Sequence, residues 1–212
     1  MTHKTIANTI ACVRRWLALC LLALAPFGAA QAAQVLFIAT SNVPTGKFRQ
    51  LADIARPHGI ELQVRYLERL PVDTDEGLFK GFDAVFFDSY LQDVVQDRLA
   101  RALPGLHAPN AWLYDAKPAW GGGLPEPVAR RLITYYSNGG RQNFEGFFAT
   151  LAAQLQGRQA QGVPEPVVFP KTAVYHPRAP GLVMADPVAW LRSQGVDPAA
   201  TNRRPVVALA LH

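Results

Sequence analysis

Short apolar runs that recur between helix-length segments constrain the fold of this chain more than any other feature. Residues 34–39 read Gln-Val-Leu-Phe-Ile-Ala, and residues 83–88 read Asp-Ala-Val-Phe-Phe-Asp. Continuous apolar runs of this length are typical of strands that are buried on both faces of a parallel sheet. Two further runs, residues 61–67 and 111–115, predict a second strand nearer a sheet edge and a fourth strand.

The segments between and after these runs predict helices. Residues 47–56, 91–103 and 127–137 each place apolar side chains on one face, and residues 76–80 predict a helical turn. Residues 141–156 predict a further helix, whose apolar face consists of Phe144, Phe147, Phe148, Leu151 and Leu155. This alternation predicts an α/β fold, with a doubly wound, mostly parallel sheet flanked by helices and joined by right-handed crossovers.

The first 32 residues have the pattern of a secretory signal peptide. Lys4, Arg14 and Arg15 precede an apolar run over residues 16–25, and an Ala-Gln-Ala cleavage site ends at Ala32. The apolar run is about half of the ~20 residues that a membrane-spanning helix needs. We therefore expect cleavage near Ala32 and export to a bacterial periplasm, with the membrane touched only through an uncleaved signal peptide.

Removal of the predicted signal peptide changes what net charge and cysteine content imply about the partners and the disulfides of the mature chain. The remaining chain carries 18 basic and 16 acidic residues, so its balance gives little support for nucleic-acid binding. Both cysteines, Cys12 and Cys20, lie in the signal peptide. The mature chain therefore has no disulfide and no cysteine metal site.

After the predicted signal peptide, residues 1–32, the pattern divides the chain into three parts. Residues 33–157 form the α/β domain, and residues 158–181 form a proline-containing linker with a Tyr-His-Pro segment. Residues 182–212 begin a second, incomplete α/β unit, with a helix over residues 186–194 and an apolar strand over residues 204–211. Either that strand docks on the preceding sheet, or it is the opening strand of a further, truncated domain.

Three segments in the last third of the chain together resemble one family. Residues 136–152 contain Ser-Asn-Gly-Gly-Arg-Gln-Asn followed by an apolar helix, residues 170–181 read Pro-Lys-Thr-Ala-Val-Tyr-His-Pro-Arg-Ala-Pro-Gly, and residues 204–209 read Arg-Pro-Val-Val-Ala-Leu. In order and spacing they resemble segments of the large subunit of cobaltochelatase (CobN), a relative of the magnesium chelatase H subunit. The resemblance covers residues 138 to 212 and extends to the preceding α/β region only in outline.

The resemblance implies binding of a tetrapyrrole, either a corrin or a porphyrin. In that family the ring receives a divalent metal, a cobaltochelatase-like ligase reaction that forms nitrogen–metal bonds with help from separate ATP-hydrolysing subunits. The ring and the metal would be substrates, and no intrinsic cofactor is expected. This chain departs from the family pattern because it stops where the long chelatase body would begin and because it carries an export signal.

We therefore expect an exported, CobN-like N-terminal fragment that binds or presents a tetrapyrrole and is not catalytic alone. Its expected partners are the tetrapyrrole, other chelatase subunits or an envelope transport protein, and not nucleic acid. Two alternatives stay open. One is a truncated or split subunit of an ATP-dependent cobaltochelatase of cobalamin biosynthesis. The other is a periplasmic interaction or scaffold domain without a small ligand.

Two groups of residues are candidate ligand contacts. Asn138, Gly139, Gly140 and Arg141 precede a predicted helix, whose free N–H groups could hold a carboxylate, although a helix–helix turn explains the glycines more simply. Tyr175 and His176 could contact the ring or its metal, although a structural turn fixed by Pro177 is the favoured explanation. The sequence predicts no catalytic residue, and it leaves any metal ligands unknown.

Polar residues at the ends of two predicted strands are a weaker candidate site. Thr40, Ser41 and Asn42 follow the first strand, with Lys47 close by, and Asp88, Ser89 and Tyr90 end the third. Doubly wound folds bind ligands at this edge, although strand-end capping explains the residues more simply. The aromatic side chains of Trp112, Tyr114 and Trp120 could stack on a flat macrocycle, or pack in the core.

Overall fold

The computed structural model describes residues 31–114, 117–169, 174–175, 183–184, 186–197 and 199–200. The chain divides into two compact units, Met1–Pro166 and Val167–His212. The predicted strand over residues 204–211 and most of the predicted signal peptide lie outside the described residues.

The first unit is built on a five-stranded sheet with the order β2-β1-β3-β4-β5. Its strands are β1 (Ala33–Ala39), β2 (Ile60–Tyr66), β3 (Ala84–Asp88), β4 (Asn110–Trp112) and β5 (Ala119–Gly121). The first four are parallel, and β5 pairs antiparallel with β4. The predicted α/β fold with a mostly parallel sheet is confirmed, and all four predicted strands are present.

Strand β5 was not predicted from the sequence. It is three residues long, and it exists because residues Asn110–Trp112 of β4 pair with it in antiparallel register. Three residues are too few to show the alternation of apolar and polar side chains that is typical of a strand, so the sequence pattern does not predict it. Trp120 lies on β5, half-buried beneath the Arg130 guanidinium, whose carbon lies 5.1 Å from the ring centroid.

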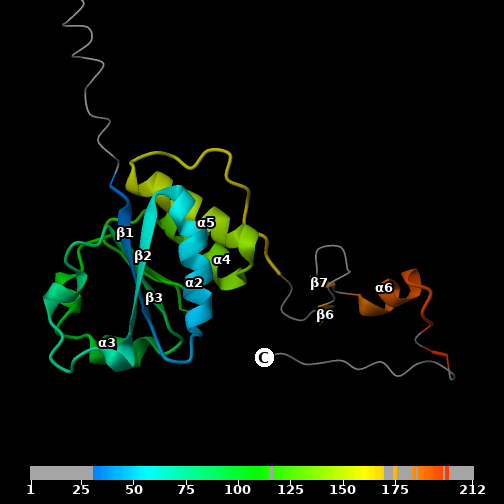
Figure 1. Ribbon diagram of the computed structural model, residues 1–212, viewed down its shortest axis with the longest axis horizontal. Coiled ribbons are helices and arrows are strands. Elements are labelled where there is room, and N and C mark those ends of the chain that lie inside the picture. The colour runs from blue at the N-terminus through cyan, green and yellow to red at the C-terminus, as the bar shows by residue number, and fades with distance from the viewer. Residues whose placement is uncertain are drawn as a thin grey trace, which may run out of the picture. The chain divides into compact units, whose positions relative to one another are not determined.

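Helices cover both faces of the sheet, as Figure 1 shows for this unit. The helices α2 (Thr45–Ala55), α4 (Glu126–Asn138) and α5 (Arg141–Leu155) pack with Val35, Phe37 and Phe86 on one face. The other face, which includes Leu36, Ile38, Val85 and Phe87, is covered by α3 (Gln92–Arg98) and by the short 3-10 helices η2 (Leu67–Arg69), η3 (Glu76–Phe79) and η4 (Leu103–Gly105). Because alternate strand residues point to opposite faces, one continuous apolar run supplies both cores.

The helix predicted over residues 91–103 is shorter than expected. Regular α-helix α3 ends at Arg98, and the chain then passes through turns into η4. Leu99 and Ala102 are nevertheless buried against the sheet. Apolar spacing alone therefore placed the right side chains in the core, although the backbone hydrogen bonds of an α-helix do not continue to Leu103.

Helices α4 and α5 confirm the predicted helical pair. Their junction lies at Gly139 and Gly140, which have φ values of 65° and 80°. Such values are accessible to glycine at little cost, so the two glycines let one helix end and the next begin at once. On α5 the predicted apolar face is confirmed, since Phe147, Phe148 and Leu151 are fully buried and Phe144 and Leu155 pack against them.

After α5, residues 158–169 contain no helix or strand. Arg131 of α4 holds part of this segment, donating through Nη2 to the carbonyl oxygens of Val163 and Pro164 at 2.8 and 3.0 Å. The hydroxyl of Tyr135 also donates to the Pro164 carbonyl. These contacts keep the start of the predicted linker on the surface of the first unit.

The second unit contains a short antiparallel pair, β6 (Val174–Tyr175) and β7 (Val183–Met184), followed by α6 (Pro187–Ser193). Helix α6 confirms the helix predicted over residues 186–194. Asp186 caps it as predicted, because its Oδ1 accepts a hydrogen bond of 2.9 Å from the Ala189 backbone N–H.

Candidate functional site

The sheet has a reversal of strand order between β1 and β3. The crossover from β1 leads through α2 to β2, whereas the crossover from β3 leads through α3 to β4 on the opposite side. The loops that leave β1 and β3 therefore diverge, and their carboxyl ends border a crevice of the kind where doubly wound folds bind ligands. Thr40 and Asp88 stand at these two strand ends.

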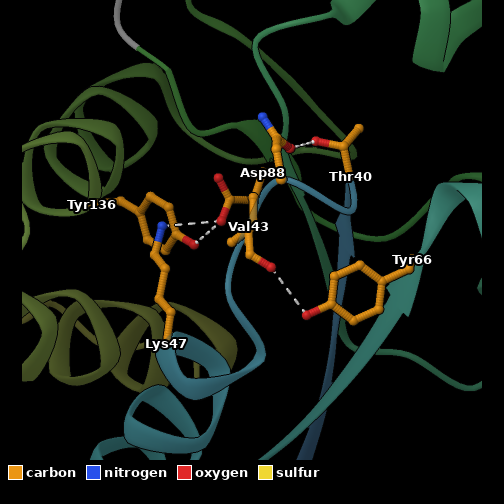
Figure 2. A network of polar contacts seen from close by, with 7 residues as sticks. Thr40, Val43, Lys47, Tyr66, Asp88 and Tyr136 are labelled. Carbon is orange, nitrogen blue, oxygen red and sulfur yellow. Dashed lines mark hydrogen bonds and ion pairs between the residues drawn. The ribbon is translucent and has the colours of Figure 1, made fainter. Parts of the chain in front are cut away.

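Asp88 is the centre of a polar network at this edge of the sheet, as Figure 2 shows. Its side chain is fully buried, and Oδ2 accepts from the Lys47 ammonium at 3.0 Å and from the Tyr136 hydroxyl at 2.6 Å. The ammonium also lies 4.3 Å from the centroid of the Tyr136 ring. The three side chains come from β3, α2 and α4, so one carboxylate joins three elements.

The second oxygen of Asp88, Oδ1, is buried and makes no well-formed hydrogen bond within the described residues. The phenol of Tyr114 lies nearby, and burial together with the Asp88 carboxylate raises the pKa of that phenol. Burial, and then the same carboxylate, raises the pKa of Tyr136 well above its ordinary value. Both phenols therefore stay protonated at neutral pH and can only donate toward the carboxylate.

The mouth of the crevice is aromatic and apolar. The ring of Tyr90 lies over that of Tyr114, with centroids 3.6 Å apart and planes inclined by 32°. Tyr90, Leu91 and Val94 are exposed by 69%, 57% and 53%. An adjoining pocket of about 440 Å³ is lined by Thr40, Ser41, Asn42, Leu67, Glu68, Leu91, Val94 and Arg98.

Two polar contacts shape the β1 side of this pocket. The hydroxyl of Thr40 donates to Oδ1 of Asn42, and Oε1 of Glu68 accepts from the Ser41 backbone N–H at 2.9 Å. That N–H is the main reason why the pKa of Glu68 is lowered from its ordinary value. The loop after β1 is therefore held in a defined shape next to apolar walls.

The predicted site at the helix junction lies elsewhere, at the start of α5. The Asn138 amide donates to the Thr134 carbonyl at 2.8 Å, and Arg141 pairs with Glu145 at 2.9 Å. Gly140 and Arg141 line a pocket of about 420 Å³ together with Gln50, Asp53, Ile54 and Phe144. Backbone geometry accounts for the two glycines, as the sequence favoured. Binding of a carboxylate at this place stays a prediction.

The other two predicted contacts belong to the second unit. Tyr175 lies in β6, where its backbone pairs with Val183 of β7. His176 lies outside the described residues. The structure therefore gives no test of the predicted role of Tyr175 and His176.

Sequence reasoning placed Lys47 and Asp88 at one edge but missed their ion pair and the contribution of Tyr136. Tyr136 occupies an apolar position of α4, and nothing in its spacing shows that its hydroxyl ends beside a carboxylate 48 residues away. Trp112 packs in the core, which was the simpler of its two explanations. It is buried and stacks on Phe87, with ring centroids 4.3 Å apart. Tyr114 instead lies at the mouth of the crevice.

Two kinds of site, a metal centre and a membrane-spanning helix, were considered for the described residues. No three His, Cys, Asp or Glu side chains within that part of the chain are grouped closely enough to hold a metal ion. In the same part of the chain, no helix has both the length and the apolar character needed to cross a membrane.

Comparison with known proteins finds a family match in the last part of the chain. The model of one family, described as CobN/Magnesium Chelatase, matches residues 133–212. The resemblance inferred from residues 138 to 212 is thereby confirmed. No curated protein matches the chain.

Among solved structures, this chain is similar to the catalytic subunit of cobaltochelatase from Mycobacterium tuberculosis. The two are 18% identical with a TM-score of 0.42, over 68% of this chain. The chain spans 12% of the length of that subunit.

The segment that the family model matches begins inside α4 rather than between elements. Residue 133 lies within α4 (Glu126–Asn138), so Tyr136 belongs to the segment whereas Asp88 and Lys47 precede it. The Asp88 network therefore ties the first residues of the family segment to the carboxyl edge of the sheet.

Proposed function

We propose that this protein is an exported, CobN-like region that binds a corrin or porphyrin and presents it for chelatase-type metal insertion. The family match over residues 133–212 carries the proposal, because the family acts in tetrapyrrole metallation. The divalent metal and the ring are substrates in this proposal, and the metal could be cobalt or magnesium. Further chelatase subunits or an envelope transport protein are the proposed partners.

Direct titration tests ring binding. Purified mature chain is titrated with protoporphyrin IX and, separately, with the corrin cobinamide, while absorbance and tryptophan fluorescence are followed. We expect saturable spectral shifts and quenching with a dissociation constant in the micromolar range, about −8 kcal/mol. If neither ring saturates, the tetrapyrrole function is wrong and the interaction-domain alternative gains support.

Export is tested by the N-terminus of the protein in a cell. The expected mature chain begins at Ala33 and is recovered from the periplasmic fraction, because basic residues and an apolar run precede an Ala-Gln-Ala site. Mass spectrometry of the recovered protein gives the N-terminus. Recovery of the uncleaved chain, with residues 1–32 still present, from the cytoplasmic fraction would contradict export.

The proposal also holds that the chain does not insert metal by itself. When the mature chain is incubated with the metal-free ring and Co²⁺ or Mg²⁺, the absorbance spectrum of the ring should change no faster than it does without the protein. Addition of chelatase partner subunits and ATP distinguishes the split-subunit alternative, since that alternative requires metal insertion once the missing parts are supplied.

A further inference from the structure

Exposed apolar side chains in the first unit gather at the carboxyl edge of the sheet. Among its described residues, the exposed large hydrophobic side chains are those of Val72, Tyr90, Leu91 and Val94. Three of these four lie within five consecutive positions, immediately after β3. Grouped exposure of this kind marks a binding surface more often than scattered exposure does, and it lies where the topology favours ligands.

The aromatic part of this surface is supported from below. The ring of Tyr114 lies against Tyr90 at a centroid distance of 3.6 Å and is itself half-buried beside Asp88. Asp88 is in turn held by Lys47 and Tyr136. Tyr90 therefore rests on an ordered ring, while most of its own surface stays open to a ligand.

Leu91, which directly follows Tyr90 in the chain, lines a pocket that supplies complementary groups. The side chains of Leu91 and Val94 form an apolar wall of this pocket, and Arg98 also lines it. Arg98 gives one Nη2–H to the Leu70 carbonyl at 2.7 Å, and a guanidinium has further N–H groups that can meet a carboxylate. Glu68 also lines the pocket and would repel a carboxylate placed near the β1 loop, which favours acidic groups toward the Arg98 side.

We propose that Tyr90, Tyr114, Leu91 and Val94 form a platform on which one face of a planar tetrapyrrole stacks, with a rim carboxylate directed toward Arg98. A broad, flat, apolar ring with charged groups only at its rim fits an exposed Tyr90 ring that is backed by Tyr114, together with apolar side chains and one cation. This inference rests on the proposed tetrapyrrole function and assigns it to the carboxyl edge of the first unit.

The test compares protoporphyrin IX binding by the full mature chain and by variants of the platform. Tyr90→Ala should weaken binding at least tenfold, because the stacking surface is removed, whereas Tyr90→Phe should bind within twofold of the original chain, because the ring is kept. The double change Leu91→Asp and Val94→Asp should weaken binding by a similar factor. All three sites are exposed, and circular dichroism confirms that the variants fold.

Matched controls separate the platform from general adsorption. Val72→Ala removes an exposed apolar side chain outside the platform, and Gln156→Ala alters the hollow of about 740 Å³ at the amino edge of the sheet. Both should bind within twofold of the original chain. If the original chain binds the porphyrin and both Tyr90→Ala and the double variant bind it with the same affinity, the platform is wrong and the proposed function still stands. Absence of binding by the original chain would instead overturn the proposed function and the platform with it.

Discussion

At the residue scale, Asp88 is a carboxylate with no exposed surface whose neutralising cation, Lys47, is 29% exposed. Burial of a charge is costly unless it is paired and hydrogen-bonded, and Asp88 has one ion pair and one hydrogen bond, both at the same oxygen. The network is therefore sensitive to loss of a partner. The two partners differ, because one supplies charge and the other only a hydrogen bond.

This difference predicts an order of destabilisation. Lys47→Met should lower the free energy of unfolding by ~2–3 kcal/mol, because it leaves a buried carboxylate without its cation. Tyr136→Phe should cost about 1–2 kcal/mol, because only a hydrogen bond to a charged group is lost. Urea denaturation followed by circular dichroism measures both. The double change Lys47→Met with Asp88→Leu should recover part of the loss, and no recovery would contradict the role of the pair.

The two phenols beside Asp88 predict a dependence of stability on alkaline pH. Their pKa values are raised in the folded state, from the ordinary value of 10.0. Above about pH 10 the unfolded chain releases these protons and the folded chain retains them, so the free energy of unfolding falls as pH rises through this range. Below that pH the contribution is fully present.

Ultraviolet absorbance of tyrosinate measures this effect. Of the six tyrosines, Tyr114 and Tyr136 should resist ionisation until the chain unfolds, because their pKa values are raised in the folded state. Replacement of Tyr136 by Phe should make the fall of stability above pH 10 less steep by about one proton. Normal titration of all tyrosines in a folded chain would contradict the buried network.

At the element scale, the packing of α4 against α5 depends on one small residue. A Cβ added at Gly146 of α5 would lie 2.4 Å from Cε1 and 2.6 Å from Cζ of Tyr135 on α4. Tyr135 is 1% exposed, and its hydroxyl is bonded to the Pro164 carbonyl, so its ring has little room to move. Glycine at position 146 is thus what allows the two helices to approach closely.

Gly146→Ala is therefore expected to destabilise the protein by about 2 kcal/mol through overpacking, despite the better helix propensity of alanine. Gly46→Ala in the first turn of α2 is the matched control, since nothing lies within 4 Å of its added Cβ. That change should be neutral or stabilise by ~0.5 kcal/mol. Thermal unfolding of both variants decides the prediction, and equal shifts of Tm would contradict the close packing.

At the scale of the whole molecule, the family boundary and the folding boundary differ. The segment that the family model matches begins at residue 133, inside α4. Nevertheless, α4 and α5 supply Leu132, Ile133, Phe147, Phe148 and Leu151 to the core of the first unit. The compact unit extends to Pro166. A match to a family model over a segment therefore does not make that segment an independent folding unit.

Two fragments test this boundary. A chain of residues 33–166 should unfold cooperatively in urea with helix and strand content intact, because it holds both apolar cores and the Arg131 contacts to residues 163–164. A chain of residues 33–132 should fail to fold, because one face of its sheet loses α5 and half of α4. Cooperative unfolding of the shorter fragment would contradict the assignment of both helices to the core.

The sequence alone was enough to predict the α/β class, four strands, the helical pair around Gly139 and Gly140, and the resemblance that the family model matches over residues 133–212. These features depend on local periodicity, on backbone conformations that glycine permits, and on residue order, all of which are present in the chain as written. The predicted contacts at residues 138–141 and 175–176 were chosen from the same local signals, and they stay predictions.

Only the tertiary structure decided which distant residues meet. Strand β5 exists because β4 offers it a partner, and the network of Lys47, Asp88 and Tyr136 joins residues that are 41 and 48 positions apart. Tyr90 and Tyr114 stack because β3 and β4 are neighbours in the sheet. Such pairs carry no local period, because sheet order and helix crossing, rather than spacing along the chain, set the distances between them.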